Sequence, residues 1–166
     1  MTTSMSKLTI ELVPRTAWFK NLRSLLTAPE WDYVRKKCYQ KANYCCEICG
    51  GVGPNHPVEC HEKWEYDEKT HTQTLTGLIA LCPACHEVKH IGLANVNGRF
   101  YDAIEHLAKV NDWSFEKANW YAHDAMELWE GRSQFDWKLD TSYLDAYKKD
   151  GFIREEETNP FKRFKS

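Results

Sequence analysis

The sequence predicts an α+β protein in which a β-hairpin near the middle of the chain is flanked by helices on both sides. Three observations support this class. Apolar residues recur at helical spacing before residue 43 and again after residue 98, and two strand-like segments meet at a polar turn over residues 67–71. A Cys-x-x-Cys pair stands on each side of that hairpin.

In the first third of the chain, we expect an arm followed by two helices. Residues 8–13 fit either a short strand or an extended arm, and residues 14–26 carry an apolar stripe at helical spacing. A second helix is expected from Pro29 to about Ala42, because proline is favoured in the first turn of a helix. Residues 44–57 contain several glycines and prolines and are expected to form a loop.

The central segment predicts a strand over residues 58–66 and a second strand over residues 72–80. A helix is expected from Leu81 to His90, with Pro83 in its first turn and Gly92 just beyond its end. The hairpin therefore leads directly into a short helix.

The last third predicts mainly helices. Two are expected over residues 99–111 and 114–132, the second with Ser114 as its N-cap. A short strand over residues 135–139 and a helix from Ser142 to Lys149, ended by Gly151, follow. Residues after about 155 are polar and are expected to be disordered.

Composition narrows the class of protein. A chain of 166 residues with 42% hydrophobic and 28% charged residues is long enough for a globular domain with a core. No apolar run approaches the roughly 20 residues that span a bilayer, and residues 1–10 lack the apolar segment of a secretion signal. We therefore expect a cytoplasmic protein without a membrane partner; its oligomeric state is not encoded in any pattern that we can interpret.

In a reducing compartment, closely spaced cysteines bind metal more often than they form disulfides. Cys46 and Cys49 form one pair and Cys82 and Cys85 form the other, so that four thiolates can surround one tetrahedral ion. This pattern predicts a structural Zn²⁺ site, whose removal should unfold this part of the chain. Cys45 is next to Cys46, but its spacing to Cys49 is poorer.

Three histidines accompany the cysteines. His86 and His90 are four residues apart and therefore project from one face of their helix. Such a pair is often only a solvated face, but the first strand of the hairpin brings His61 beside this helix. Together these residues form a candidate for a second metal site.

The motif Cys-x-x-Cys, a strand carrying a histidine, and then Leu-Cys-x-x-Cys-His-x-x-x-His resembles the HNH endonucleases of the ββα-metal type, in their four-cysteine, zinc-braced branch. The resemblance extends from Trp31 to Gly92. It implies a ββα-metal module with flanking N- and C-terminal helices. The domain organisation is then an arm and helix (1–28), the zinc-braced module (29–95), a helical extension (96–154) and a tail (155–166).

The resemblance also implies one-metal hydrolysis of phosphodiester bonds, with His61 as the general base and His86 and His90 as ligands of a second divalent ion (Mg²⁺, Mn²⁺, Ni²⁺ or Zn²⁺). The family usually has Asp or His before the base as a further ligand. Here that position is Cys60, which as a thiolate would favour a softer ion, and Glu59 or Glu62 is the alternative ligand. Gly77 stands where the family often has an asparagine.

The implied partner is nucleic acid, with DNA preferred over RNA. The net charge of -2 argues against constitutive tight binding, but residues 1–50 carry eight Lys and Arg against four acids. On charge alone, a solvated helix face is the simpler interpretation of these cations. The candidate contacts to nucleic acid are Arg35, Lys36, Lys37, Lys41 and Lys89. The alternative function is a non-catalytic zinc module that binds nucleic acid or protein.

Overall fold

The computed structural model of the protein describes residues 6–151 and has the predicted mixed α+β class. In chain order the elements are η1 (Arg15–Ala17), α1 (Leu22–Leu25), α2 (Ala28–Lys41), β1 (Glu59–Asp67), β2 (Thr72–Leu81), α3 (Pro83–Lys89), α4 (Ile91–Val96), α5 (Phe100–Asn111), α6 (Phe115–Arg132), β3 (Lys138–Asp140), η2 (Ser142–Leu144) and α7 (Asp145–Lys149). Of the helices in residues 6–151, none has both the length and the hydropathy needed to cross a bilayer.

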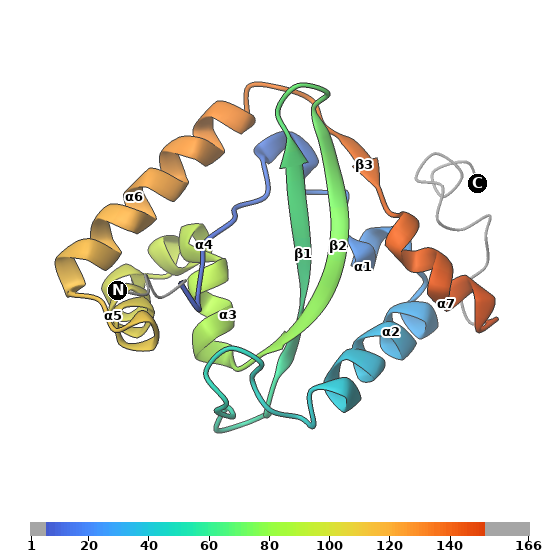
Figure 1. Ribbon diagram of the computed structural model, residues 1–166, viewed down its shortest axis with the longest axis horizontal. Coiled ribbons are helices and arrows are strands. Elements are labelled where there is room, and N and C mark those ends of the chain that lie inside the picture. The colour runs from blue at the N-terminus through green and yellow to red at the C-terminus, as the bar shows by residue number, and fades with distance from the viewer. Residues whose placement is uncertain (1–5, 152–166) are drawn as a thin grey trace, which may run out of the picture.

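A three-stranded sheet with the order β1-β2-β3 divides the molecule. Strands β1 and β2 form the predicted antiparallel hairpin, with Glu59 opposite Leu81 at its open end, and β3 adds parallel to β2. Figure 1 shows helices α3 to α6 on one side of the hairpin and α1, α2 and α7 on the other. The predicted strand near residue 137 is therefore present, starts at Lys138, and belongs to the same sheet.

Each side of the hairpin has its own apolar cluster. On the side of α3 to α6, the apolar stripe of α5 is buried through Ile104 and Leu107, which pack in one cluster with Val88 and Ile91. Three of the four paired cysteines belong to this cluster, so the predicted metal site is part of the core. On the other side, Trp64 of β1 packs with residues of α1, α2 and η2.

The segment predicted as one helix over residues 14–26 is broken in the structure. The turn η1 ends at Ala17, and α1 does not begin until Leu22. The break is at Asn21, whose backbone is extended and whose side chain accepts a hydrogen bond from the Ser24 backbone N–H as an N-cap. Asparagine at this position favours a new helix start over the continuation of the apolar stripe.

Residues 8–13 form the extended arm, one of the two predicted alternatives, and no strand. The arm is held by side chains: Asn111 Oδ1 accepts hydrogen bonds from the Lys7 and Leu8 backbone N–H groups at 2.8 and 2.9 Å, and Tyr121 Oη accepts one from Ile10 at 3.2 Å.

Helix α4 was not predicted. Gly92 was expected to follow the end of a helix, but it lies inside α4, because the chain only bends at His90 (φ -110°, ψ 50°) and then resumes a helix. The predicted tail, residues 155–166, lies outside the described residues.

Candidate metal sites and the adjoining cleft

The four paired cysteines lie together. Cys46 and Cys49 are in the loop between α2 and β1, Cys82 is the N-cap residue of α3, and Cys85 is in its first turns. Their Sγ atoms all lie within 4.8 Å of one another, and Cys49 Sγ is 3.6 Å from Cys82 Sγ. Four thiolates at about 2.3 Å from a tetrahedral Zn²⁺ are ~3.8 Å apart. The cluster could therefore bind a metal such as zinc.

The backbone around Cys46 stabilises a thiolate there, whereas burial raises the pKa of Cys82 and of Cys85. Burial raises the pKa of Cys46, but the backbone N–H groups of Cys49, Cys82 and Ile48 outweigh it and bring the pKa down to about 7. His106 of α5 reaches the cluster from the far side, with Nε2 at 3.2 Å from Cys85 Sγ. Cys45 is exposed and lies outside the cluster.

The three histidines converge at a second place. His61 comes from β1, and His86 and His90 come from α3 and its C-cap. Their ligand atoms lie within 4.8 Å of one another, and the two Nε2 atoms of His86 and His90 are 3.0 Å apart. Two imidazoles on one tetrahedral Zn²⁺ have their nitrogens roughly 3.3 Å apart. We call this group the histidine cluster.

The fold explains why the histidine cluster forms. Strand β2 leads directly into α3, and α3 contacts both strands of the hairpin, so the helix packs beside β1. The spacing of four residues places His86 and His90 on one face of α3. The ring centroid of His61 then lies 5.2 Å from that of His86 and 5.3 Å from that of His90.

Glu59 orients His86. Its Oε2 lies 2.5 Å from His86 Nδ1 and its Oε1 lies 2.9 Å from His56 Nε2. Since Nδ1 of His86 is engaged, its Nε2 is the nitrogen presented to His90. A carboxylate on the outer nitrogen of a histidine is the arrangement that fixes metal-binding imidazoles in many proteins. The sequence contained a signal for it, because Glu59 and His61 are two apart and so share one face of a strand.

Two of the three imidazoles, His61 and His90, have lowered pKa values. Burial, together with the positive charges that His90, His86 and Lys89 can carry, lowers the pKa of His61 to about 2. Burial and the neighbouring His86 lower the pKa of His90 to about 4. At neutral pH both rings are therefore free of the second proton and can bind a metal ion or accept a proton.

Of the other residues predicted beside His61, Cys60 and Glu62 lie outside the histidine cluster. Cys60 was predicted as a ligand of the catalytic metal, but its side chain instead packs against an apolar cluster that contains Cys38 of α2, and it is outside the histidine cluster. The physical reason is the alternation of a strand, which directs adjacent residues to opposite faces. Glu62 accepts hydrogen bonds from the Leu22 backbone N–H at 2.8 Å and from Trp64 Nε1 at 3.2 Å. Of the three candidates, Glu59 is the one that contacts the cluster.

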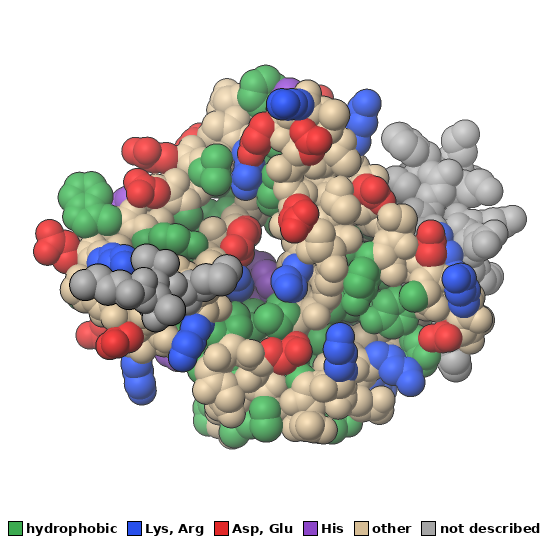
Figure 2. Space-filling model, in the orientation of Figure 1, with side chains coloured by type: hydrophobic (Ala, Val, Ile, Leu, Met, Phe, Trp, Pro, Cys, Tyr) green, Lys and Arg blue, Asp and Glu red, His purple; other side chains and the backbone are tan. Residues whose placement is uncertain are grey.

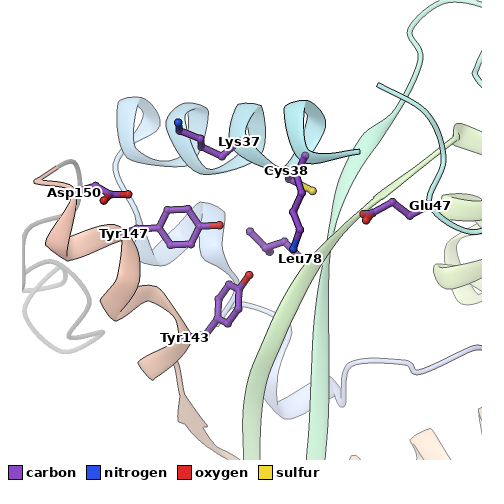
Figure 3. A pocket seen from close by; sticks show the side chains of 8 residues that line it. Lys37, Cys38, Glu47, Leu78, Tyr143, Tyr147 and Asp150 are labelled. Carbon is purple, nitrogen blue, oxygen red and sulfur yellow. The ribbon is translucent and has the colours of Figure 1, made fainter. Parts of the chain in front are cut away.

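The basic side chains of α2 that were predicted to contact nucleic acid do not line the cleft over the histidine cluster. Arg35 Nε and Lys36 Nζ bind Asp32 at 2.8 and 3.0 Å. Lys37 and Lys41 line a pocket of about 290 Å³ between α2 and α7, together with Cys38, Tyr143 and Tyr147. Figure 3 shows this pocket, which shares no lining residue with the cleft over the histidines.

Lys89 was predicted as a nucleic-acid contact, but the structure gives it an internal role. Its side chain is only 8% exposed, and Nζ lies 2.9 Å from Glu11 Oε2 and 3.0 Å from Thr9 Oγ1. Lys89 therefore ties the N-terminal arm to α3.

The histidine cluster lines a large cleft of about 1090 Å³. Its lining comes from the arm, η1, α1, both long strands, α3, α4 and α6. Figure 2 shows the central hollow of the molecule with histidine at its bottom. The candidate site is thus reachable from solvent, with His61 and His86 partly exposed and His90 exposed.

Comparisons with protein-family models, with curated proteins and with solved structures found no match for this chain. The four-cysteine cluster and the mixed α+β class are established by the structure. The function is therefore argued from the site itself.

Proposed function

We propose that the protein is a metal-dependent phosphodiesterase of HNH type, an endonuclease acting on nucleic acid. In this proposal, the cysteine cluster binds a structural zinc ion, and the hairpin with α3 serves as a ββα-metal module. The observation that carries the proposal is the convergence of three imidazoles within 4.8 Å in an open cleft, with Glu59 on the outer nitrogen of His86.

In the proposed reaction, His86 and His90 hold a divalent ion that neutralises charge on the scissile phosphate and stabilises the departing oxygen. His61 accepts the proton of the water that attacks phosphorus, and the bond to the leaving oxygen breaks. Within residues 6–151, no group hydrogen-bonds the His61 ring, so both of its nitrogens remain available. Its lowered pKa keeps it unprotonated at neutral pH.

A second candidate has specific support. Because the ligand atoms of all three imidazoles lie within 4.8 Å of one another, His61 is also placed to be a third metal ligand, as in three-histidine zinc sites. His61 would then not be free to act as the general base of the proposed reaction, and the protein would be a zinc module that binds nucleic acid or protein without cleaving it.

The experiment that tests the proposal is a plasmid-nicking assay with Mg²⁺, Mn²⁺, Ni²⁺ or Zn²⁺, repeated with single-stranded DNA and RNA. The variant is His61→Ala, and the matched control is His123→Ala, an exposed histidine of α6. We expect His61→Ala to lose about 100-fold or more of the activity, as removal of a general base does, while His123→Ala cleaves like the wild type.

Metal content separates the two candidates. If His61 is the base, His61→Ala retains the second metal ion; if His61 is a ligand, the variant loses it. The proposed endonuclease activity would be overturned if the wild type, with every metal and substrate, cleaved no more than His61→Ala.

A further inference from the structure

We infer that the cleft over the histidine cluster binds a single-stranded polynucleotide, whose unpaired bases contact the exposed apolar side chains of the cleft while its phosphates pair with Lys20, Arg23 and Lys63. This inference rests on the proposed function and names the substrate class of that site. It follows from the charge, the exposed rings and the shape of the cleft lining.

The charge of the lining is the first observation. Lys20, Arg23 and Lys63 are exposed, line the cleft and form no ion pair with any carboxylate of residues 6–151. Of the lining acids, Glu11 is paired with Lys89, and Glu62 is partly exposed and interacts electrostatically with Arg23. The lining thus carries four cations (Lys20, Arg23, Lys63 and Lys89) against three carboxylates (Glu11, Glu62 and Glu65), so the cleft has a small excess of positive charge although the chain as a whole carries -2.

The exposed rings and apolar side chains are the second observation. Trp18 is 51% exposed in the lining, although its indole is fixed: Nε1 donates to the Val13 carbonyl at 2.8 Å. Its ring stacks on Trp129 with centroids 6.1 Å apart. Leu93 and Val96 of α4 add exposed apolar surface to the same cleft, at 61% and 81%. Apolar surface of this kind marks an interaction site.

Unpaired bases satisfy both observations. Proteins that bind single strands combine cations along the backbone path with aromatic rings on which bases stack. In a duplex, the flat faces of the bases are already covered by their neighbours, so Trp18, Leu93 and Val96 would gain little from a duplex. The cleft volume of about 1090 Å³ also exceeds the roughly 300–1,000 Å³ of small-molecule sites, which suits a chain of nucleotides.

The position of α3 argues against binding of this helix in the major groove of a duplex. Helices that enter the major groove project from the protein surface. Here Cys85, Val88 and Lys89 of α3 are buried, and His86 and His90 line the cleft from within. The helix is therefore unable to insert into a groove, whereas a flexible single strand can descend to the histidines.

The test uses the full chain carrying His61→Ala, so that binding is measured without cleavage. A fluorescently labelled single strand of about 12 nucleotides, within the site sizes of single-strand binders, is compared with the same sequence as a duplex by anisotropy. We expect the single strand to bind at least tenfold more tightly. Each of Lys20→Ala and Lys63→Ala should lower the slope of log K against log salt by about 0.7.

In the same background, Trp18→Ala should weaken single-strand binding by about tenfold, in line with the loss of one stacked base. Trp18→Phe, which retains a ring, should recover most of it. Trp120→Ala is the matched control, because Trp120 is 64% exposed on α6 but does not line the cleft. Thermal melting of each variant confirms that it is folded.

Equal affinity for single strand and duplex, or full binding by a folded Trp18→Ala, would overturn the inference. These outcomes are independent of the nicking assay. If the wild type binds single strands but does not cleave them, only the proposed endonuclease activity is overturned. If it cleaves and prefers duplex DNA, only the inference about the substrate is overturned.

Discussion

The two ring nitrogens of His86 have different partners, and this difference is central to the candidate site. Nδ1 faces the Glu59 carboxylate, and Nε2 faces His90. Glu59 in turn contacts His56, so a chain of polar side chains supports the inner imidazole from outside the histidine cluster. Such support fixes the ring orientation and raises the basicity of the inner nitrogen.

Glu59→Ala removes this support. We expect the affinity of the histidine cluster for Co²⁺ or Zn²⁺ to fall about 10–100-fold, the usual effect of losing a carboxylate behind a metal-binding histidine. Metal titration followed by absorption spectroscopy measures it. Glu65→Ala, an exposed carboxylate of the same strand, is the control and should bind metal like the wild type. Unchanged affinity in Glu59→Ala would show that Glu59 does not orient a metal ligand.

At the residue scale, the sequence predicted side-chain placement correctly where the spacing of residues along the chain is sufficient to determine it. The two Cys-x-x-Cys pairs do come together. The placements of Cys60 and Lys89 differ from those that we expected, for two different reasons. Cys60 follows the alternation of its strand towards α2, which the sequence did contain. The ion pair of Lys89 with Glu11 joins residues 78 positions apart, and no local pattern encodes such a contact.

At the scale of elements, α3 serves both clusters. Cys82 and Cys85 lie at its beginning, and His86 and His90 continue it. Because the loop that carries Cys46 and Cys49 precedes β1, a metal ion in the cysteine cluster would fix α3 relative to the hairpin. The position of the imidazoles would then depend on the cysteines.

Two neighbouring cysteines offer a matched pair of variants for this claim. Cys49→Ser removes a thiolate of the cluster, and we expect loss of bound zinc and of cooperative unfolding, because a structural zinc site contributes folding free energy directly. Cys45→Ser, four positions earlier and exposed, should retain both. Zinc analysis together with thermal melting followed by circular dichroism distinguishes them, and a Cys49→Ser protein that melts like the wild type would refute the structural site.

Elements with strong periodicity were predicted closely. The hairpin, α2, α5 and α6 were expected within about two residues of their bounds, because their patterns persist over several turns or over both strands. The break at Asn21 and the separate helix α4 were not expected, since a single capping side chain or one bent residue decides them. The parallel pairing of β3 with β2 was also not predictable from the sequence, because tertiary packing decides which strand β3 pairs with.

At the scale of the whole molecule, the N-terminal arm connects distant parts. It runs from Asn111 at the end of α5, past Tyr121, to Ser133 at the end of α6, where the Ser133 hydroxyl accepts from the Arg15 backbone N–H at 3.0 Å. The arm also supplies part of the cleft lining. The shape of the cleft thus depends on how firmly the arm is held.

Asn111→Ala tests the anchoring of the arm. The Asn111 amide accepts from the Lys7 and Leu8 backbone N–H groups and donates to the Leu8 carbonyl at 2.8 Å. Since the backbone groups of the buried Leu8 would lose their partners, we expect the free energy of unfolding to fall by about 1–3 kcal/mol. Urea unfolding measures this change. Asn97→Ala, at an exposed C-cap, should change it by less than about 0.5 kcal/mol.

The parallel strand β3 has a consequence for the synthesis of the protein. All four paired cysteines and all three clustered histidines precede residue 91, whereas β3 begins at Lys138. On the ribosome, where chains emerge from the N-terminus, every proposed metal ligand is synthesised before the last strand. If the proposed sites bind metal, loading can therefore begin on the nascent chain, before the third strand joins the sheet.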